Sequence, residues 1–457
     1  MKMLNNTVSL VALTAGVLAM VSPAQAETLQ EALAKAYASN PTLQSARATL
    51  RATDEGVAQA ISGWRPSISV EGTSSKKQQE TNTTRRKVDT TPRTLALSLS
   101  QSLYAGGQTV AKTDGAEHDV YAQRARLVTE EQTVLLNAAT AYLNVLRDGA
   151  VVELNEKNEQ VLSSQLEATQ DRFNVGEITR TDVHLAESRL AGATADRIQS
   201  EGDLKTSRAN YANIIGNAPA DLSEPLLGLP LPETLDEALN VADTNNPTIV
   251  AALYDEKSAQ ADIASTKGQL LPSLDLSGSA SRSLDTASDG YWSNAYEAKL
   301  TLSVPLYQSG SVYSQLREAR QTAQASRLDL DQAKRDVAEE VRTAWESLAA
   351  TRARIDAIKT QVRAAETALE GVQREASVGS RTVLDVLDAE QELLDARVNL
   401  VKSQRDKTVA ELSLLSSIGN LTASTMNLAV DFYNAQGHYQ DVRNKWFGGD
   451  IDGGADK

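Results

Sequence analysis

Apolar side chains recur at alternating steps of four and three residues over a long stretch in the second half of the chain, from Val337 to Ala376. This alternation is a heptad seam, which predicts a long helix packed against other helices. Extended back to Ser311, the helix would be about 100 Å long, because an α-helix rises about 1.5 Å per residue. That length exceeds the needs of a globular domain, so the pattern indicates a rod that spans a distance. The seam consists of Val337, Val341, Ala344, Leu348, Thr351, Ile355, Ile358, Val362, Ala365, Leu369, Val372 and Ala376.

Four shorter stretches alternate between polar and apolar residues, which is the period of a β-strand. They are residues 67–72, 94–103, 273–278 and 299–306, and a long polar loop over residues 73–92 joins the first two. Each approaches the roughly 9–11 residues with which a tilted strand crosses a bilayer. In a soluble sandwich the apolar face would meet a second sheet, whereas in an outer-membrane barrel it would meet lipid.

The two halves of the chain repeat one pattern. The turn motifs Val175-Gly176 and Val378-Gly379 lie 203 residues apart, and five further pairs of short motifs share this offset. Near the start of each half the offset is 206, as for the Thr-Leu-x-Glu-Ala-Leu motifs at residues 28–33 and 234–239. One unit of short helix, longer helix, strand pair and long helical hairpin has therefore been duplicated.

The repeat, and the proline-rich stretch between its two copies, predict the domain organisation. The first structural repeat is expected over residues 27–215 and the second over residues 234–419. Between them, residues 216–233 contain four prolines, which no helix tolerates, so this stretch is a linker. Residues 420–457 have few periodic positions and end in an acidic, glycine-containing tail that is typical of disorder.

The start of the chain predicts export. Residues 1–26 combine a basic residue, Lys2, with an apolar run over residues 8–21 and an Ala-Gln-Ala ending, the pattern of a secretory signal peptide. The mature protein is therefore expected to begin at Glu27. Together with the long helices, this exported start favours lipid over a second sheet as the partner of the apolar strand faces.

Composition excludes several classes of protein. There is no cysteine, so no disulfide framework is available, and no run of 18 apolar residues predicts a spanning helix. Without Lys2, 44 basic residues stand against 60 acidic ones, a formal net charge of −16. This balance argues against nucleic acid as a partner, because phosphate binding requires a basic surface.

The number of strands predicts an oligomer. Four strands cannot close a barrel, since the smallest outer-membrane barrels have about eight. An open sheet edge is not tolerated in lipid. Strands from several copies of the chain must therefore be pooled.

The sequence around the second turn, Val378-Gly379-Ser380-Arg381-Thr382 and onward to Ala389, closely resembles the TolC family of outer-membrane efflux and type I secretion channels. Residues 438–446 also look like the C-terminal segment of alphaproteobacterial members. The resemblance implies a mixed α and β fold, in which a trimeric 12-stranded outer-membrane β-barrel continues as a 12-helix periplasmic α-barrel. Each protomer would be a tandem repeat of helix, strand pair and long helical hairpin.

The resemblance also implies a function. The protein would be a passive trimeric exit duct in the outer membrane, with a long periplasmic extension, for type I protein secretion, multidrug efflux or both. An inner-membrane ABC or proton-driven transporter and a periplasmic adaptor (membrane fusion) protein would recruit it, and the helical tips would open by untwisting. The alternative is a structural periplasmic coiled-coil adaptor protein without its own pore. Lipid-type strand alternation, and the absence of a lipid-attachment cysteine after the signal, argue against this alternative.

Candidate functional residues lie at the turns of the hairpins. Asp385 and Asp388 share one helix face and match the constricting aspartates of the family, so three copies would form two carboxylate rings that attract cations. Thr181, Asp182 and Arg381 match polar links that hold the entrance closed, and Arg381 with Asp182 is expected to carry more of the closure. The hairpin tips themselves are expected at Val175, Gly176, Val378 and Gly379.

Aromatic residues near the strand ends predict a girdle at the membrane surfaces. They are Trp64, Tyr104, Trp292, Tyr296 and Tyr307.

No enzyme, metal or cofactor site is predicted. His184 and Glu187 share a helix face, but no third metal ligand lies near them in the sequence, so a surface pair is expected. The glycine pair Gly106-Gly107 lacks the Lys-Ser or Lys-Thr that completes a phosphate-binding loop.

Overall fold

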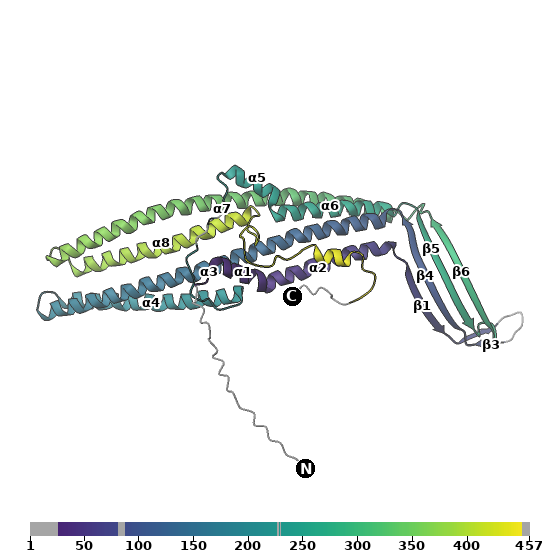
Figure 1. Cartoon of the computed structure of the whole chain (residues 1–457), viewed down its shortest axis with the longest axis horizontal. Coiled ribbons are helices and arrows are strands. Elements are labelled where there is room, and N and C mark those ends of the chain that lie inside the picture. The colour runs from purple at the N-terminus through teal and green to yellow at the C-terminus, as the bar shows by residue number, and fades with distance from the viewer. Residues whose placement is uncertain (1–25, 81–86, 226–227, 229, 450–457) are drawn as a thin grey trace, which may run out of the picture.

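The structure is a computed structural model that describes residues 26–80, 87–225, 228 and 230–449. Most of the predicted signal peptide, residues 1–25, and the end of the predicted acidic tail, residues 450–457, lie outside the described residues. Figure 1 shows an elongated molecule with a sheet at one end, two long helical hairpins at the other and shorter helices between them.

The sheet has four antiparallel strands in the order β1-β4-β5-β6, which leaves β1 and β6 as open edges. Two strands differ from expectation, because β5 extends to Leu284 and β6 begins at Trp292. Pairing between β5 and β6 along their whole length accounts for the extension. Pro305 follows the end of β6 and cannot donate to a strand ladder. The strands are β1 (Ser67–Ser74), β4 (Arg93–Ala105), β5 (Ser273–Leu284) and β6 (Trp292–Ser303).

Residues 73–92, expected to be a polar loop, contain a two-stranded ribbon. Strand β2 (Lys77–Glu80) pairs with β3 (Lys87–Thr90) and extends the β1–β4 hairpin outward. Its residues are mostly polar and do not alternate, so the sequence period gave no sign of these strands.

One face of the four-stranded sheet is apolar and uncovered. Ile68, Val70, Leu95, Leu300 and Leu302 are between 59% and 69% exposed. Within the described residues no second sheet packs on this face, in contrast to a soluble sandwich. No helix in the described ranges is long and apolar enough to cross a membrane.

The two strand pairs have the same register. Ser67 of β1 lies opposite Ser100 of β4, and Ser273 of β5 lies opposite Ser303 of β6. These positions are related by the offsets of 206 and 203 found in the sequence. Leu99 of β4 and Gly278 of β5 pair across the junction between the two halves.

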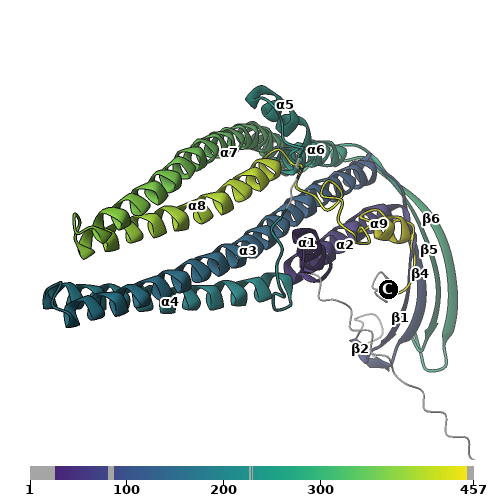
Figure 2. The ribbon, with the colours of Figure 1, turned by 60° about the vertical axis from the view of Figure 1, so that its left-hand side comes forward.

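Four helices continue the order of the strands beyond one end of the sheet (Figures 1 and 2). Neighbours in this layer are α2 with α3, α3 with α6, and α6 with α7. Helices α4 and α8 return along α3 and α7 and so complete the two hairpins. The helices are α2 (Pro41–Ile61), α3 (Gln108–Asn174), α4 (Arg180–Ile215), α6 (Pro247–Gly268), α7 (Ser311–Ser377) and α8 (Val383–Ser417).

The heptad seam lies within α7, a single helix of 67 residues. Most of its positions are buried, among them Val341, Leu348, Ile355 and Leu369, and α7 as a whole packs against α6 and α8. The predicted rod is therefore confirmed.

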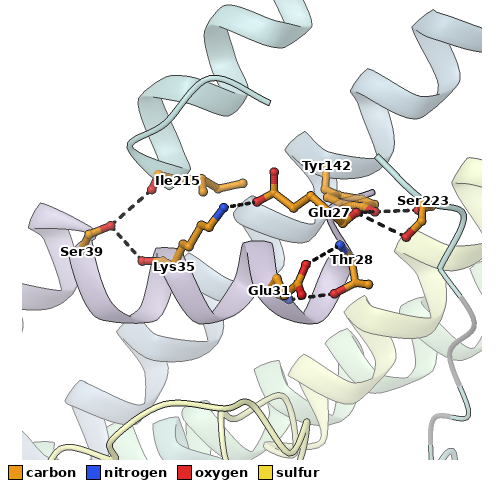
Figure 3. Close-up of polar contacts among 8 residues, drawn as sticks. All are labelled: Glu27, Thr28, Glu31, Lys35, Ser39, Tyr142, Ile215 and Ser223. Carbon is orange, nitrogen blue, oxygen red and sulfur yellow. Dashed lines mark hydrogen bonds and ion pairs between the residues drawn. The ribbon is translucent and has the colours of Figure 1, made fainter. Parts of the chain in front are cut away.

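Polar contacts at mid-length join the start of the predicted mature protein to the predicted linker (Figure 3). The amide of Glu27 donates to the carbonyl oxygen of Asp221 at 2.7 Å, and the amide of Ser223 donates to that of Glu27 at 3.0 Å. The hydroxyl of Tyr142 lies 2.7 Å and 2.6 Å from the carbonyl oxygens of Glu27 and Ser223. Burial raises the pKa of Tyr142, which keeps this hydroxyl protonated as a donor. Two short helices, α1 (Leu29–Ser39) and α5 (Leu235–Asn245), lie at the same level.

Residues 420–449, called the C-terminal segment below, are ordered against the helices although their sequence lacks a period. The segment contains a short helix, α9 (Gly437–Val442), that packs on α2. His438 Nδ1 lies 3.1 Å from Asp54 Oδ2 of α2, and burial raises the pKa of Asp54. Contacts with α2 and α3, rather than a helical pattern of its own, fix this segment.

Gly106 and Gly268 approach each other closely where the strands meet the helices. Gly106 has a φ of +61°, and a Cβ atom there would lie 2.2 Å from the carbonyl oxygen of Gly268. Gly107 has a φ of +80°, but no atom lies within 4 Å of a Cβ built on it. Gly107→Ala is therefore expected to cost only about 1–2 kcal/mol, the penalty of the left-handed conformation.

Gly106→Ala should cost more than this, because the backbone of α6 must also move. Thermal unfolding of the purified protein in detergent measures the difference. Equal unfolding midpoints for Gly106→Ala and Gly107→Ala would contradict the importance of the close approach.

Candidate functional site

Both hairpins turn in the same way at the tips. Gly176 and Gly379 have φ values of 80° and 77°, which the left-handed end of a helix requires. The amide of Gly176 donates to the carbonyl oxygen of Phe173 at 2.9 Å, and that of Gly379 donates to Ala376 at 3.1 Å. The preceding residues, Val175 and Val378, are largely exposed, so each tip presents an apolar side chain to solvent.

A capping box starts each return helix. The Asp182 carboxylate accepts from the backbone amide of Thr179 at 2.9 Å, and Asp385 accepts likewise from Thr382 at 2.9 Å. Each carboxylate also accepts from the threonine hydroxyl. Hydrogen bonds to the charged form lower the pKa of both carboxyl groups. Both aspartates therefore stay ionised well into the acidic range.

Asp388 joins the two hairpins. Its Oδ1 atom accepts from Nη2 of Arg189, on α4, at 2.5 Å. Arg189 was not predicted from the sequence, because its partner lies on another helix and neither spacing nor the repeat relates the two residues. The negative charge of Asp388 is therefore compensated by an arginine of the same chain.

Arg381 and Asp182 are not brought together within one chain. The guanidinium Nε of Arg381 donates to Glu375 at 2.8 Å, and Nη1 lies 4.0 Å from Asp385. The carboxylate of Asp182 is engaged by Thr179, and Thr181 is exposed.

An apolar cluster between the hairpins accompanies the Arg189–Asp388 pair. It joins α3, α4 and α8 close to the tips and is buried except at its edge. No periodic signal marks it, because its members come from three helices. The cluster consists of Leu162, Leu190, Ala193, Val383 and Leu387.

The predicted aromatic residues are all exposed and lie at different heights. Tyr104 lies at the helical end of β4, Trp64 and Tyr307 lie just beyond the helical ends of β1 and β6, and Trp292 begins β6 at the opposite end. Tyr296 lies inside β6, opposite Ala280 of β5, and not at a strand end as expected. The correction follows from the earlier start of β6.

His184 Nδ1 lies 2.8 Å from Glu187 Oε2 on the surface of α4. Across the residues that the structure describes, no group of three or more His, Cys, Asp or Glu side chains is placed to hold a metal ion.

Comparison with known proteins gives matches along most of the chain. The profile of the family described as outer membrane efflux protein matches residues 32–217 and 238–420. The outer membrane efflux protein BepC of Brucella suis is 35% identical over 93% of this chain and 92% of its own length. The outer membrane protein TolC of Escherichia coli is 28% identical over 88% of this chain and 84% of its own length.

The fold is also shared with solved structures. The crystal structure of the Campylobacter jejuni CmeC outer membrane channel superimposes with a TM-score of 0.79. The match covers 91% of this chain and 89% of that one, at 13% sequence identity. The arrangement of sheet and hairpins is therefore that of an outer-membrane channel.

Proposed function

Because this chain belongs to the outer membrane efflux protein family, it is an exit duct of the outer membrane for efflux or secretion, and we propose that three copies form one channel. The matched relatives are described as outer-membrane efflux proteins and channels. The observation that supports the proposed trimer is an open four-stranded sheet with an uncovered apolar face. Three such sheets would close a 12-stranded barrel, which leaves no free edge in lipid. A coiled-coil adaptor without a pore would have no lipid in which to bury this apolar face of the sheet.

Each copy would contribute two structural repeats, residues 27–215 and 234–419, joined by the linker 216–233. In the described part of one chain, α3 packs between α2 and α6, whereas α7, its repeat equivalent, packs on that level against α6 alone. We propose that α2 of the next copy completes the layer and that a 12-helix periplasmic barrel results. Neighbouring protomers would then meet in the way that the two halves of one chain already do.

The entrance would lie at the helical tips. Rings of Asp385 and Asp388 from three copies would concentrate negative charge there and attract cations. Arg189 compensates Asp388, so Asp385 would carry more of this charge. Arg381 and Asp182 keep part of their side chains exposed, and a link between them, with Thr181 beside it, would form between adjacent hairpins.

Other proteins would supply the energy for transport and would control when the entrance opens. We propose that a periplasmic adaptor (membrane fusion) protein contacts the tips, where Val175 and Val378 expose apolar surface. An inner-membrane ABC or proton-driven transporter would supply the cargo and the energy. Untwisting of the hairpins would then open the entrance.

Single-channel conductance in a planar bilayer tests this function. We expect discrete long-lived pores that a trivalent cation blocks from one side only. The block should persist as the pH falls below about 3.9, the ordinary pKa of an aspartate, because the Thr382 cap lowers the pKa of Asp385. It should be lost only when the pH falls through that lowered pKa.

The double variant Asp385→Asn, Asp388→Asn should weaken the block, and Asp395→Asn, on the same helix but farther from the tip, should not. A folded oligomer that never conducts would overturn the proposed function.

A further inference from the structure

The C-terminal segment contains two exposed aromatic residues close to the start of the sheet. Trp446 is 58% exposed and Phe447 is 86% exposed. Nη1 of Arg65 donates to the carbonyl oxygen of Lys445 at 2.7 Å, and the same guanidinium lies 4.9 Å from the centre of the Trp446 ring. Arg65 lies two residues before the first residue of β1. The aromatic pair is therefore fixed at the boundary between helix and strand.

The uncovered apolar face of the sheet begins at this boundary. Ile68 of β1 and Leu302 of β6 begin the uncovered apolar face just beyond it, and Leu306 and Tyr307 are exposed at the same end. Figure 1 shows the chain running on from α9 toward the ends of the strands before it turns back. The position of Trp446 and Phe447 is thus continuous with the surface that meets lipid.

The side chains have the chemistry of a membrane interface. Tryptophan is enriched where hydrocarbon meets headgroups, and cationic side chains nearby attract anionic headgroups. Arg65 and Lys445 supply two such cations next to the aromatic pair, in a protein whose net charge is −15. In water, by contrast, the described residues would leave the large apolar ring of Phe447 86% exposed.

We propose that Trp446 and Phe447 insert into the periplasmic leaflet of the outer membrane and anchor the C-terminal segment to the lipid surface around the barrel. The anchor rests on the proposed orientation, in which the helices point into the periplasm. It gives the C-terminal segment a partner that neither the channel walls nor the entrance supplies.

Quenching of tryptophan fluorescence by lipid tests the anchor. The full-length processed protein, with Trp64→Phe, Trp292→Phe and Trp345→Phe, retains Trp446 as its single tryptophan. It would be reconstituted in phosphatidylethanolamine and phosphatidylglycerol vesicles with acyl chains brominated close to the headgroup. We expect Trp446 to lose about half of its emission, as a residue of the interface should. Arg65→Ala in the same background should remove most of this loss, because it releases the segment.

Two matched proteins separate the possible outcomes. Phe432 is an exposed aromatic residue of the same segment, but its neighbour Tyr433 contacts Tyr37 of α1, nearer the middle of the molecule. Tyr433 also lies against Arg47, which is about 20 Å along α2 from its end at Ile61, and Arg65 lies beyond that end. Phe432→Trp with Trp446→Phe, as the single tryptophan, should therefore show no quenching by brominated lipid.

A protein that keeps only Trp292 reports on the sheet. If Trp292 is quenched and Trp446 is not, the anchor is overturned while the membrane position of the sheet stands. Protection of Trp446 from both brominated lipid and aqueous iodide would show that protein covers it, and would also overturn the proposal. If neither tryptophan is quenched, the sheet is not in lipid and the proposed function fails with it.

Discussion

The double variant Thr73→Cys, Thr301→Cys should form a covalent trimer that runs as one band on non-reducing gels and returns to monomer on reduction. Thr73 lies on β1 and Thr301 on β6, the two open edges of the sheet. If protomers meet as the two halves of one chain do, the register between them can be read from the repeat. The positions equivalent to Thr301 and Thr73 are Ser98 and Ser279, which lie directly opposite each other on β4 and β5.

The expected geometry suits a disulfide. Residues opposite each other on antiparallel strands have Cα atoms about 4.5–5.5 Å apart, and disulfides span about 4.4–6.8 Å. The natural chain has no cysteine, so no other pair competes. Three interfaces around a closed ring would each form one bond, which should convert most of the protein to trimer.

A register control shows whether the repeat predicts the interface. Ser69 lies on the same face of β1 as Thr73 but four residues away, roughly 13 Å along the strand. Ser69→Cys with Thr301→Cys should therefore remain monomeric on the gel. If this control forms trimers and the first variant does not, the protomers meet in another register.

Arg189→Asp should make cells permeable to bulky antibiotics such as vancomycin, because it replaces an attraction between the two hairpins with a repulsion next to Asp388. Both side chains are more than one-third exposed, so the attraction is worth about 0.5 kcal/mol per pair. Three pairs in a trimer would together favour the closed entrance by roughly 1.5 kcal/mol, which is about tenfold in population. Repulsion in the variant adds to this shift.

A charge swap assigns the role of Asp388. Arg189→Asp with Asp388→Arg restores an opposite pair between α4 and α8 and should restore antibiotic exclusion. Arg180→Asp makes the same charge change at the start of α4 and serves as the control. Cells that carry it should still exclude the antibiotic. Assembly of each protein is checked by its amount in the outer membrane. Leakage that persists in the swapped protein would mean that Asp388 acts as part of an acidic constriction and not through Arg189.

Repeated local patterns were predicted well. The seam of α7, the alternation of β1 and β4 and the glycine turns at Gly176 and Gly379 each depend on neighbours a few residues away in the chain. Such interactions leave a period or a motif that can be read without a structure. Element ends were less certain, as β6 shows, because its start at Trp292 depends on its partner strand.

Two sets of contacts between distant elements were not predicted. Arg189 and Asp388 lie on different hairpins, and the C-terminal segment is held by single contacts such as His438 with Asp54. Neither arrangement has a period, because each involves one residue from each element.

By itself the sequence determined the long helices, the strand pairs, their duplication and the turn motif that marks the family. Each of these features depends on the spacing of residues along the chain. Only the tertiary structure decided which charges meet near the hairpin tips and where Trp446 and Phe447 lie. The reason is physical: a spacing constrains neighbours on one helix or strand, whereas a pairing across elements depends on how those elements pack.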